Sequence, residues 1–295
     1  MASAKLATVG ILSIGDMGMG LAKLLVAKGF SVATNCTGRS KDTIERVKAA
    51  QVTDLSTDTD LVKTCDIILS VVPPRDAEAT AQRIIDAMAL VTKAHPPLYF
   101  ADMNAVAPST IKQIAQNIDA AQVPITLIDG SILGGPPHPT SGASSSGSAA
   151  TTAVGDWNVP SLPTSGPLQV ADIPGFGAAL STALNMRHIS PAIGASSGLK
   201  MCFASLSKGY SAIAVQSFTT AQRLGVLPAL QEALQELVPQ RVKQTEGALV
   251  NMPPKAYRWV REMKEKVGQR KRGRTVEDVA VAMAEGLEKK RKKTE

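Results

Sequence analysis

Residues 7–35 read ATVGILSIGDMGMGLAKLLVAKGFSVATN, and this stretch decides the fold. It begins with an apolar run, passes through a glycine-marked turn, continues with apolar residues at helical spacing and ends in a second apolar run. This order is typical of a buried strand, a tight turn, an amphipathic helix and a parallel strand. The N-terminus of such a helix presents unpaired N–H groups and a dipole that attract phosphate. The stretch therefore predicts a unit that binds a dinucleotide.

The turn is the predicted contact with the cofactor. The usual pattern is GxGxxG, and a serine stands here where the first glycine is expected. The second glycine lets the backbone approach the pyrophosphate, and the third lets the helix pack against the strand. The alternative is a glycine-rich turn without a ligand. The predicted cofactor-binding residues of the turn are Ser13, Ile14, Gly15, Asp16, Met17 and Gly18.

The residues after the second strand indicate which nicotinamide cofactor is bound. An acidic residue at this point usually holds the ribose 2′-hydroxyl of NAD, but residues 36–41 read CTGRSK and the first acid is Asp42. Arg39 can pair with a 2′-phosphate, and Ser40 and Lys41 can add donors. NADP(H) is therefore favoured over NAD(H). The alternative is that these residues only decorate the start of a helix.

Further apolar runs continue the alternation and predict a parallel sheet covered by helices on both faces. We expect this domain to cover residues 1–190, with a last strand near 160–164 and a last helix near 174–184. Within it, the Ser- and Gly-rich residues from about 138 to 157 predict a flexible insertion, with a lid over the site as the alternative. The other expected strands cover residues 66–72, 97–103 and 125–132, and the other expected helices cover 17–29, 40–50, 75–93 and 108–119.

The remainder, residues 191–295, is predicted to be an all-helical domain with a basic tail. Between His188 and Arg223 the only charged side chains are Lys200 and Lys208, which predicts a long helix over about 195–224, buried on most of its faces. Further helices are expected to about residue 267. The segment 255–295 holds 14 Lys/Arg and 7 Asp/Glu, and so accounts for the whole net charge of +7.

Small and polar residues follow several of the expected strands. Val72 and Pro73 would form a stiff wall beside the cofactor. Asn104 would hydrogen-bond the nicotinamide ribose, although a turn-forming Asn fits the spacing equally well. In the segment SILGG of residues 131–135, the glycine pair would let backbone N–H groups point into a cleft that suits a carboxylate or oxyanion, and Ser131 would add a hydroxyl. A tight turn is the alternative for this segment.

Lys200 is the strongest single candidate for catalysis. A lysine within an apolar helix is costly unless it has a partner or a task. Desolvation lowers the pKa of an ammonium group, which makes it useful as a general acid or base near neutral pH. The alternative is that the side chain extends to the surface.

Several other classes of protein are disfavoured by composition. The three cysteines form no CxxC pair and the three histidines lack ligand spacing, so we expect no metal site and a reducing, cytoplasmic location. No apolar run approaches the ~20 residues of a membrane span. The run KKRKK near the C-terminus leaves a nuclear location open, but a nucleic-acid partner is not favoured.

Four segments in this order resemble the β-hydroxyacid dehydrogenases, which include 3-hydroxyisobutyrate and 6-phosphogluconate dehydrogenases and have imine reductases as relatives. VGILSIGDMG resembles the cofactor segment GFIGLGxMG, and IDGSILGG resembles the substrate signature DAPVSGG. GASSGLKMCFA resembles GxGxxxKxxNN, and Arg261 begins a segment that is similar to a later KDL motif. MPPKAYRWV is similar to a poorly characterised, 6-phosphogluconate-dehydrogenase-like branch.

The resemblance implies an α/β fold, with an N-terminal Rossmann-type doubly wound parallel sheet followed by an all-α C-terminal domain. It places Lys200 at the catalytic lysine and Arg261 near the cofactor, and it implies a homodimer that pairs through the helical domain. Two features depart from the family pattern: Leu133 replaces a serine, and two asparagines after the lysine are replaced, which predicts a less polar pocket. The substrate-binding positions are Ser131, Leu133, Gly134, Gly135, Phe203 and Ala204.

We therefore expect an NADP(H)-dependent oxidoreductase that transfers a hydride between nicotinamide and a carbonyl or alcohol carbon. Two alternatives remain open. One is an imine reductase-like biosynthetic enzyme, against which the retention of Lys200 argues. The other is a non-catalytic cofactor-binding or interaction protein.

Overall fold

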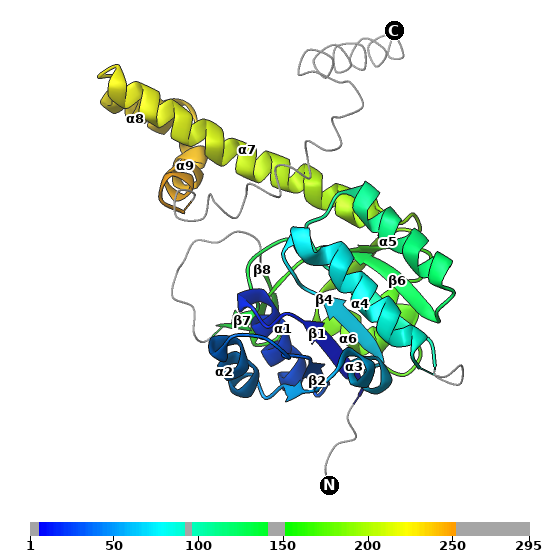
Figure 1. Cartoon of the computed structure of the whole chain (residues 1–295). Helices are drawn as coiled ribbons and strands as arrows, with labels where there is room; N and C mark the ends of the chain where they lie inside the picture. Colours follow the sequence, from blue (N-terminus) through cyan, green and yellow to red (C-terminus); the bar gives the residue numbers. More distant parts are fainter. Residues whose placement is uncertain (1–5, 92–95, 141–150, 252–295) are drawn as a thin grey trace.

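The computed structural model describes residues 6–91, 96–140 and 151–251. In this part of the chain, eight strands form one sheet in the order β11-β10-β6-β5-β4-β1-β2-β3, and helices cover both of its faces (Figure 1). From β3 to β6 every neighbouring pair is parallel. The strands are β1 (Thr8–Leu12), β2 (Ser31–Thr34), β3 (Thr53–Asp54), β4 (Ile67–Ser70), β5 (Leu98–Asp102), β6 (Ile125–Gly130), β10 (Leu162–Ser165) and β11 (Met186–Ser190).

The buried side chains separate into two clusters, one on each face of the sheet. Val9 and Ile11 of β1 point to one face, and Leu12 points to the other, because side chains alternate along a strand. One face packs against α1 (Asp16–Ala27), α2 (Lys41–Ala49) and α6 (Gly177–Ala183), and the other against α3 (Asp58–Thr64), α4 (Ala77–Ala89) and α5 (Pro108–Ala121). This arrangement confirms the predicted doubly wound sheet.

Some elements differ from the expectation. The sequence reasoning did not identify β3, α3 or β11, which are short or mixed in polarity. Two 3-10 turns, η1 (Pro74–Asp76) and η3 (Val170–Asp172), precede α4 and α6. Strand β10 pairs antiparallel to β6 and parallel to β11, so both strands at this edge run against the others. An antiparallel edge is common in otherwise parallel sheets.

Part of the segment expected as a flexible insertion is paired. Strands β7 (His138–Pro139), β8 (Thr151–Val154) and β9 (Trp157–Pro160) form a small antiparallel sheet. Gly155, at φ +60°, and Asp156 form the two-residue connection between β8 and β9. A glycine–acid pair between β-branched and aromatic residues is a hairpin signal, which the composition of the segment obscured. Residues 141–150 lie outside the described residues.

Three consecutive helices follow the sheet, α7 (Ala195–Arg223), α8 (Leu227–Leu237) and α9 (Pro239–Asn251). The predicted long helix is present, and it begins and ends within one residue of the expected bounds. It extends away from the sheet and carries α8 and α9 at its far end (Figure 1). The division into domains at residue 190 stays a prediction, and the basic tail lies outside the described residues.

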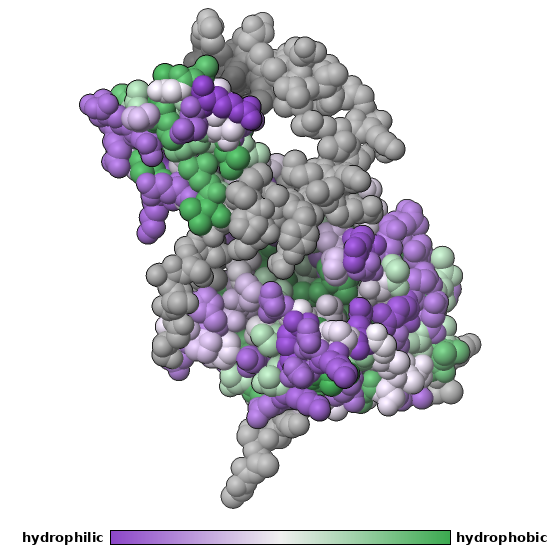
Figure 2. Space-filling model, turned by 60° about the vertical axis from the view of Figure 1, so that its left-hand side comes forward, coloured by the Kyte–Doolittle hydropathy of each residue, from purple (hydrophilic) through white to green (hydrophobic). Residues whose placement is uncertain are grey.

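The exposure of α7 differs from the expectation of a helix buried on most faces. Its first two turns pack against the sheet, but Leu206 and Ile213 are 76% and 67% exposed in this single chain. Apolar surface also faces outward on the described part of the helical region in Figure 2. The far part of α7 extends beyond the sheet (Figure 1), where it contacts α8 and α9, and among the described residues nothing covers Leu206 or Ile213.

Candidate active site

The turn after β1 has the geometry of a phosphate cradle. Ser13 adopts φ +79°, the left-handed conformation that glycine usually supplies at this position. A Cβ at Gly18 would overlap the carbonyl oxygen of Ser13, so only glycine permits this close packing of helix on turn. A Cβ at Gly15, in contrast, would meet no atom within 4 Å, so the backbone here borders open space.

The N-terminus of α1 lies beside that open space, and no side chain caps it. Its first-turn N–H groups, from Asp16, Met17 and Gly18, are the donors that a pyrophosphate requires. The Ile14 side chain is buried in the core and anchors the turn there. The residues present therefore fit a dinucleotide at the position that the sequence predicted.

The loop after β2 carries the predicted adenosine-side residues. Arg39, in the loop, and Lys41, the first residue of α2, are both exposed. Ser40 has a structural task as well, because its hydroxyl accepts a hydrogen bond from the Thr43 N–H at 3.4 Å and caps α2. A pairing of Ser40 with a phosphate would compete with this cap.

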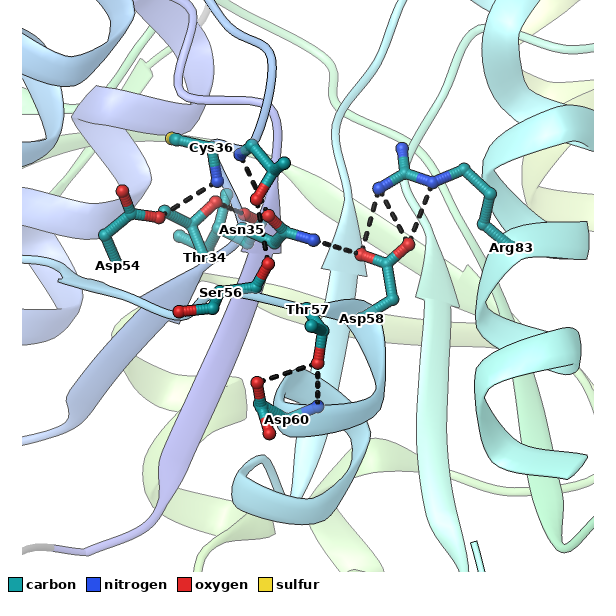
Figure 3. Close-up of polar contacts among 11 residues, drawn as sticks. Thr34, Asn35, Cys36, Asp54, Ser56, Thr57, Asp58, Asp60 and Arg83 are labelled. Atoms are coloured by element: carbon teal, nitrogen blue, oxygen red, sulfur yellow. Dashed lines mark hydrogen bonds and ion pairs between the residues drawn. The ribbon is translucent and has the colours of Figure 1, made fainter. Parts of the chain in front are cut away.

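Hydrogen bonds hold this loop against the connection between β3 and α3 (Figure 3). The Cys36 N–H donates to Asp54 Oδ1 at 2.9 Å, and the Thr37 hydroxyl donates to the Ser56 carbonyl at 2.8 Å. Burial, together with the nearby carboxylate of Asp54, raises the pKa of the Cys36 thiol. The sequence analysis did not anticipate these contacts, because they join segments about 20 residues apart.

The Asp58–Arg83 ion pair lies next to the same loop. Arg83 of α4 donates to both carboxylate oxygens of Asp58, at 2.9 Å each. Asn35 donates to the Asp58 carboxylate at 2.7 Å and accepts from the Thr37 N–H at 2.9 Å (Figure 3). Asn35 therefore links the ion pair to Thr37 of the loop.

Asn104 lies at the carboxyl edge of the sheet, but its amide is used within the protein. Its oxygen accepts from the Val72 N–H at 2.7 Å, and its nitrogen donates to Ser70 and to Asp102 at 3.0 and 2.8 Å. Burial raises the pKa of Asp102 to about 6, and the bonds from Asn104 oppose that shift. Asn104 thus fixes the segment that leads to Pro73, rather than presenting its N–H groups to a ribose.

Asp129 is the residue that sequence reasoning overlooked within its own motif. It is fully buried at the end of β6 and accepts from Ser165 Oγ at 2.7 Å, Gly194 N–H at 2.8 Å and Ser197 Oγ at 2.6 Å. The Ser197 N–H adds a further bond at 3.2 Å. A carboxylate at this point satisfies the N-terminus of α7 and anchors the helix on the sheet.

Ser131 belongs to the same anchor. Its hydroxyl lies 2.9 Å from Ser196 Oγ, which donates to the Pro163 carbonyl, and both serines are fully buried. Ser131 therefore holds the loop against α7, and its hydroxyl faces the protein interior. A task in substrate binding would have to come through the backbone of the loop instead.

Lys200 lies one turn beyond this anchor and contacts the predicted substrate loop. Its ammonium nitrogen donates to the Ile132 carbonyl at 2.6 Å, and the side chain is half-buried. Gly134, at φ +139°, allows the loop to turn, and Leu133 pairs its backbone with Ser161. The fold thus brings residues 131–135 and Lys200 together, although they are more than 60 positions apart in the chain.

The remaining predicted positions do not converge on one point. Both Ala204 and Phe203 belong to α7, where Ala204 is buried and Phe203 is 39% exposed. Gly135, the last residue of the substrate loop, is half-buried. Arg261 lies outside the described residues. Among the described residues, no group of three or more His, Cys, Asp or Glu side chains could hold a metal ion, and no helix there is long and apolar enough to cross a membrane.

Comparison with known families gives two matches that together span most of the chain. Residues 8–154 match the NAD binding domain of 6-phosphogluconate dehydrogenase, and residues 221–289 match a domain of unknown function (DUF1932).

Solved structures show the same fold. A conserved protein of unknown function, described as structurally similar to 3-hydroxyacid dehydrogenases, matches with a TM-score of 0.63 and 25% identity over 90% of each chain. A 3-hydroxyisobutyrate dehydrogenase from Salmonella typhimurium matches with a TM-score of 0.61 and 17% identity, covering 90% of this chain and 87% of that one. An imine reductase from Myxococcus stipitatus, in complex with NADP+, matches with a TM-score of 0.56 and 18% identity, covering 85% and 77%.

Proposed function

We propose a hydride-transfer reaction for this chain, on the premise that it belongs to the β-hydroxyacid dehydrogenase family. The proposed enzyme is an NADP(H)-dependent oxidoreductase that interconverts a carbonyl and an alcohol. One observation carries this proposal: the Lys200 ammonium lies 2.6 Å from the backbone of the glycine loop that follows β6. A cation held at that loop can donate a proton to the oxygen of a substrate that binds there.

When bound, the cofactor supplies or accepts the hydride. Lys200 gives its proton to the substrate oxygen as the carbonyl carbon is reduced, and takes that proton back in the reverse direction. The hydrogen bond to Ile132 holds the ammonium in place until substrate arrives. Residues 131–135 orient the substrate through backbone donors, since the Ser131 hydroxyl is engaged with Ser196.

The substrate we infer is less polar than a small hydroxy acid. Leu133 stands where the family signature has a serine, and Phe203 and Ala204 stand where it has asparagines. Each replacement removes a hydrogen-bonding group and leaves apolar surface in its place. The same change suits an imine, so ketones and imines should be offered side by side.

The preference for NADP(H) rests on the loop after β2. Asn35 occupies the end of that strand where an NAD-binding enzyme usually has an acid, and exposed Arg39 and Lys41 follow. Leu206 and Ile213 on α7 and Leu237 on α8 are exposed in this chain, which favours a homodimer that pairs through this region. Light scattering tests the dimer, and a monomer at micromolar concentration contradicts it.

The first experiment is a titration of the purified protein with NADPH and with NADH. Gly15→Ala should leave the melting temperature unchanged, because the new methyl group meets open space. The same methyl group would occupy the pyrophosphate position, so NADPH affinity should fall at least tenfold. Arg39→Ala should weaken NADPH and leave NADH unchanged. Equal binding of both cofactors by the wild type contradicts the NADP(H) preference.

Once a substrate class reacts, variants of α7 test the catalytic role of Lys200. Lys200→Ala should lower turnover about 10²-fold or more while NADPH binding persists. Lys208→Ala, two turns further along α7, is the matched control and should keep turnover within about twofold. Unchanged turnover in Lys200→Ala removes that residue from the mechanism.

A further inference from the structure

We propose that the Asp58–Arg83 ion pair determines cofactor specificity by removing a negative charge from the site of the 2′-phosphate. This inference rests on the proposed use of NADP(H). Neither residue belongs to the cofactor loop, and neither would be found by inspecting that loop alone.

The placement of Asp58 is the first step. It begins α3, directly after the connection that follows β3, and β2 and β3 are parallel neighbours. The carboxylate therefore lies at the same edge of the sheet as residues 36–41 (Figure 3). Asn35 bonds to Asp58 at 2.7 Å and to the Thr37 N–H at 2.9 Å, so a single side chain separates this carboxylate from the loop.

The charge of Asp58 is the second step. Its side chain is only 19% exposed, so water screens it poorly. Arg83 meets both carboxylate oxygens in a bidentate pair, the geometry in which guanidinium and carboxylate attract most strongly. With Arg83 present, the pair is neutral. Without Arg83, the unpaired Asp58 carboxylate would lie next to the loop that would bind the 2′-phosphate dianion.

The consequence differs for the two cofactors. NADPH carries the 2′-phosphate and would be repelled, whereas NADH has a neutral hydroxyl there and would be affected little. Repulsion between partly screened charges of this kind corresponds to a loss of about five- to tenfold in NADPH affinity. Arg83 thus supports NADPH binding without touching the cofactor.

The test measures the dissociation constants of NADPH and NADH by calorimetry for wild type, Arg83→Met and the double variant Asp58→Asn/Arg83→Met. Arg83→Met keeps the length of the side chain and leaves Asp58 unpaired. It should weaken NADPH about five- to tenfold and NADH less than twofold, and the NADPH loss should shrink as salt is raised from about 0.05 to 0.5 M. The double variant should recover most of the NADPH affinity, because the amide introduced at position 58 is neutral and can still accept from Asn35.

Arg187→Met is the control for lost positive charge. Arg187 is exposed on β11, which is the outermost strand on the side of the sheet away from β2 and β3. Its replacement should leave both affinities unchanged. Equal weakening of NADPH and NADH in Arg83→Met, or failure of the double variant to recover, overturns the inference. If the wild type itself shows no preference for NADPH, the proposed cofactor is wrong. A preference that Arg39→Ala abolishes and Arg83→Met leaves intact rejects this inference alone.

Discussion

We expect the Ser197 hydroxyl to contribute strongly to the attachment of α7 to the sheet. Ser197 is fully buried, and its Oγ donates to Asp129 Oδ1 at 2.6 Å, the shortest of the bonds to that carboxylate. In Ser197→Ala this bond is lost, while the bonds from Ser165, Gly194 and the Ser197 N–H remain. The perturbation therefore removes one donor without leaving the carboxylate unsatisfied.

The expected cost follows from that geometry. A hydrogen bond to a charged group contributes about 1.5–3 kcal/mol. Alanine regains up to about 0.5 kcal/mol through its higher helix propensity, so the net loss should be about 1–2.5 kcal/mol. Urea unfolding followed by circular dichroism measures this loss directly.

Ser211→Ala is the matched control on the same helix. Its hydroxyl donates only to the Ser207 carbonyl within the helix, in an exposed position, so stability should change by less than about 0.5 kcal/mol. A loss below about 0.5 kcal/mol in Ser197→Ala as well would show that the Asp129 cluster does not anchor α7. The account of how Lys200 is positioned would then fail with it.

Three further predictions concern the turn after β1 and the edge beside it. Burial raises the pKa of Asp102 to about 6, so the folded protein holds a proton there between about pH 4 and 6 that the unfolded chain releases. Relative to Asp102→Asn, wild-type stability should therefore fall as pH rises through this window, by about 3 kcal/mol in total, and unfolding curves that run parallel with pH would contradict it. Gly18→Ala forces a methyl group into the Ser13 carbonyl and should destabilise the protein by about 2 kcal/mol or more, measured by urea unfolding. Ser13→Gly relieves the left-handed conformation and should stabilise by about 0.5–1 kcal/mol, and a lower melting temperature would refute that reading.

The order of the longer strands and helices followed from local pattern, whereas the short or mixed elements β3, α3 and β11 did not. Continuous apolar runs between helix-like segments are typical of strands buried on both faces, and the glycines of residues 13–18 are typical of a tight turn between strand and helix. For the same reason Lys200 stood out, since a lysine is conspicuous in an apolar helix whatever lies around it. The hairpin at Gly155 carried a local signal too, but the polar residues before it concealed the signal.

The sequence pattern did not predict which groups the individual polar side chains contact. Asn104 and Ser131 were predicted to face ligands, and the structure turns their polar groups toward Val72 and Ser196 instead. The roles of Asp129 and of the Asp58–Arg83 pair could not be predicted from the sequence, because the residues that bond to each other lie 25 to 68 positions apart in the chain. The exposed flank of α7 likewise depends on where the helix leaves the sheet.

The sequence by itself determined the strand-turn-helix unit, its phosphate cradle and the position of Lys200 in an apolar helix. Backbone conformation and burial depend mainly on neighbouring residues and on the spacing of apolar residues along the chain, and both can be read from the sequence. Only the tertiary structure decided which side chains face the site and which hold it together. A hydrogen bond needs a partner within about 3 Å, and folding alone brings distant residues to that separation.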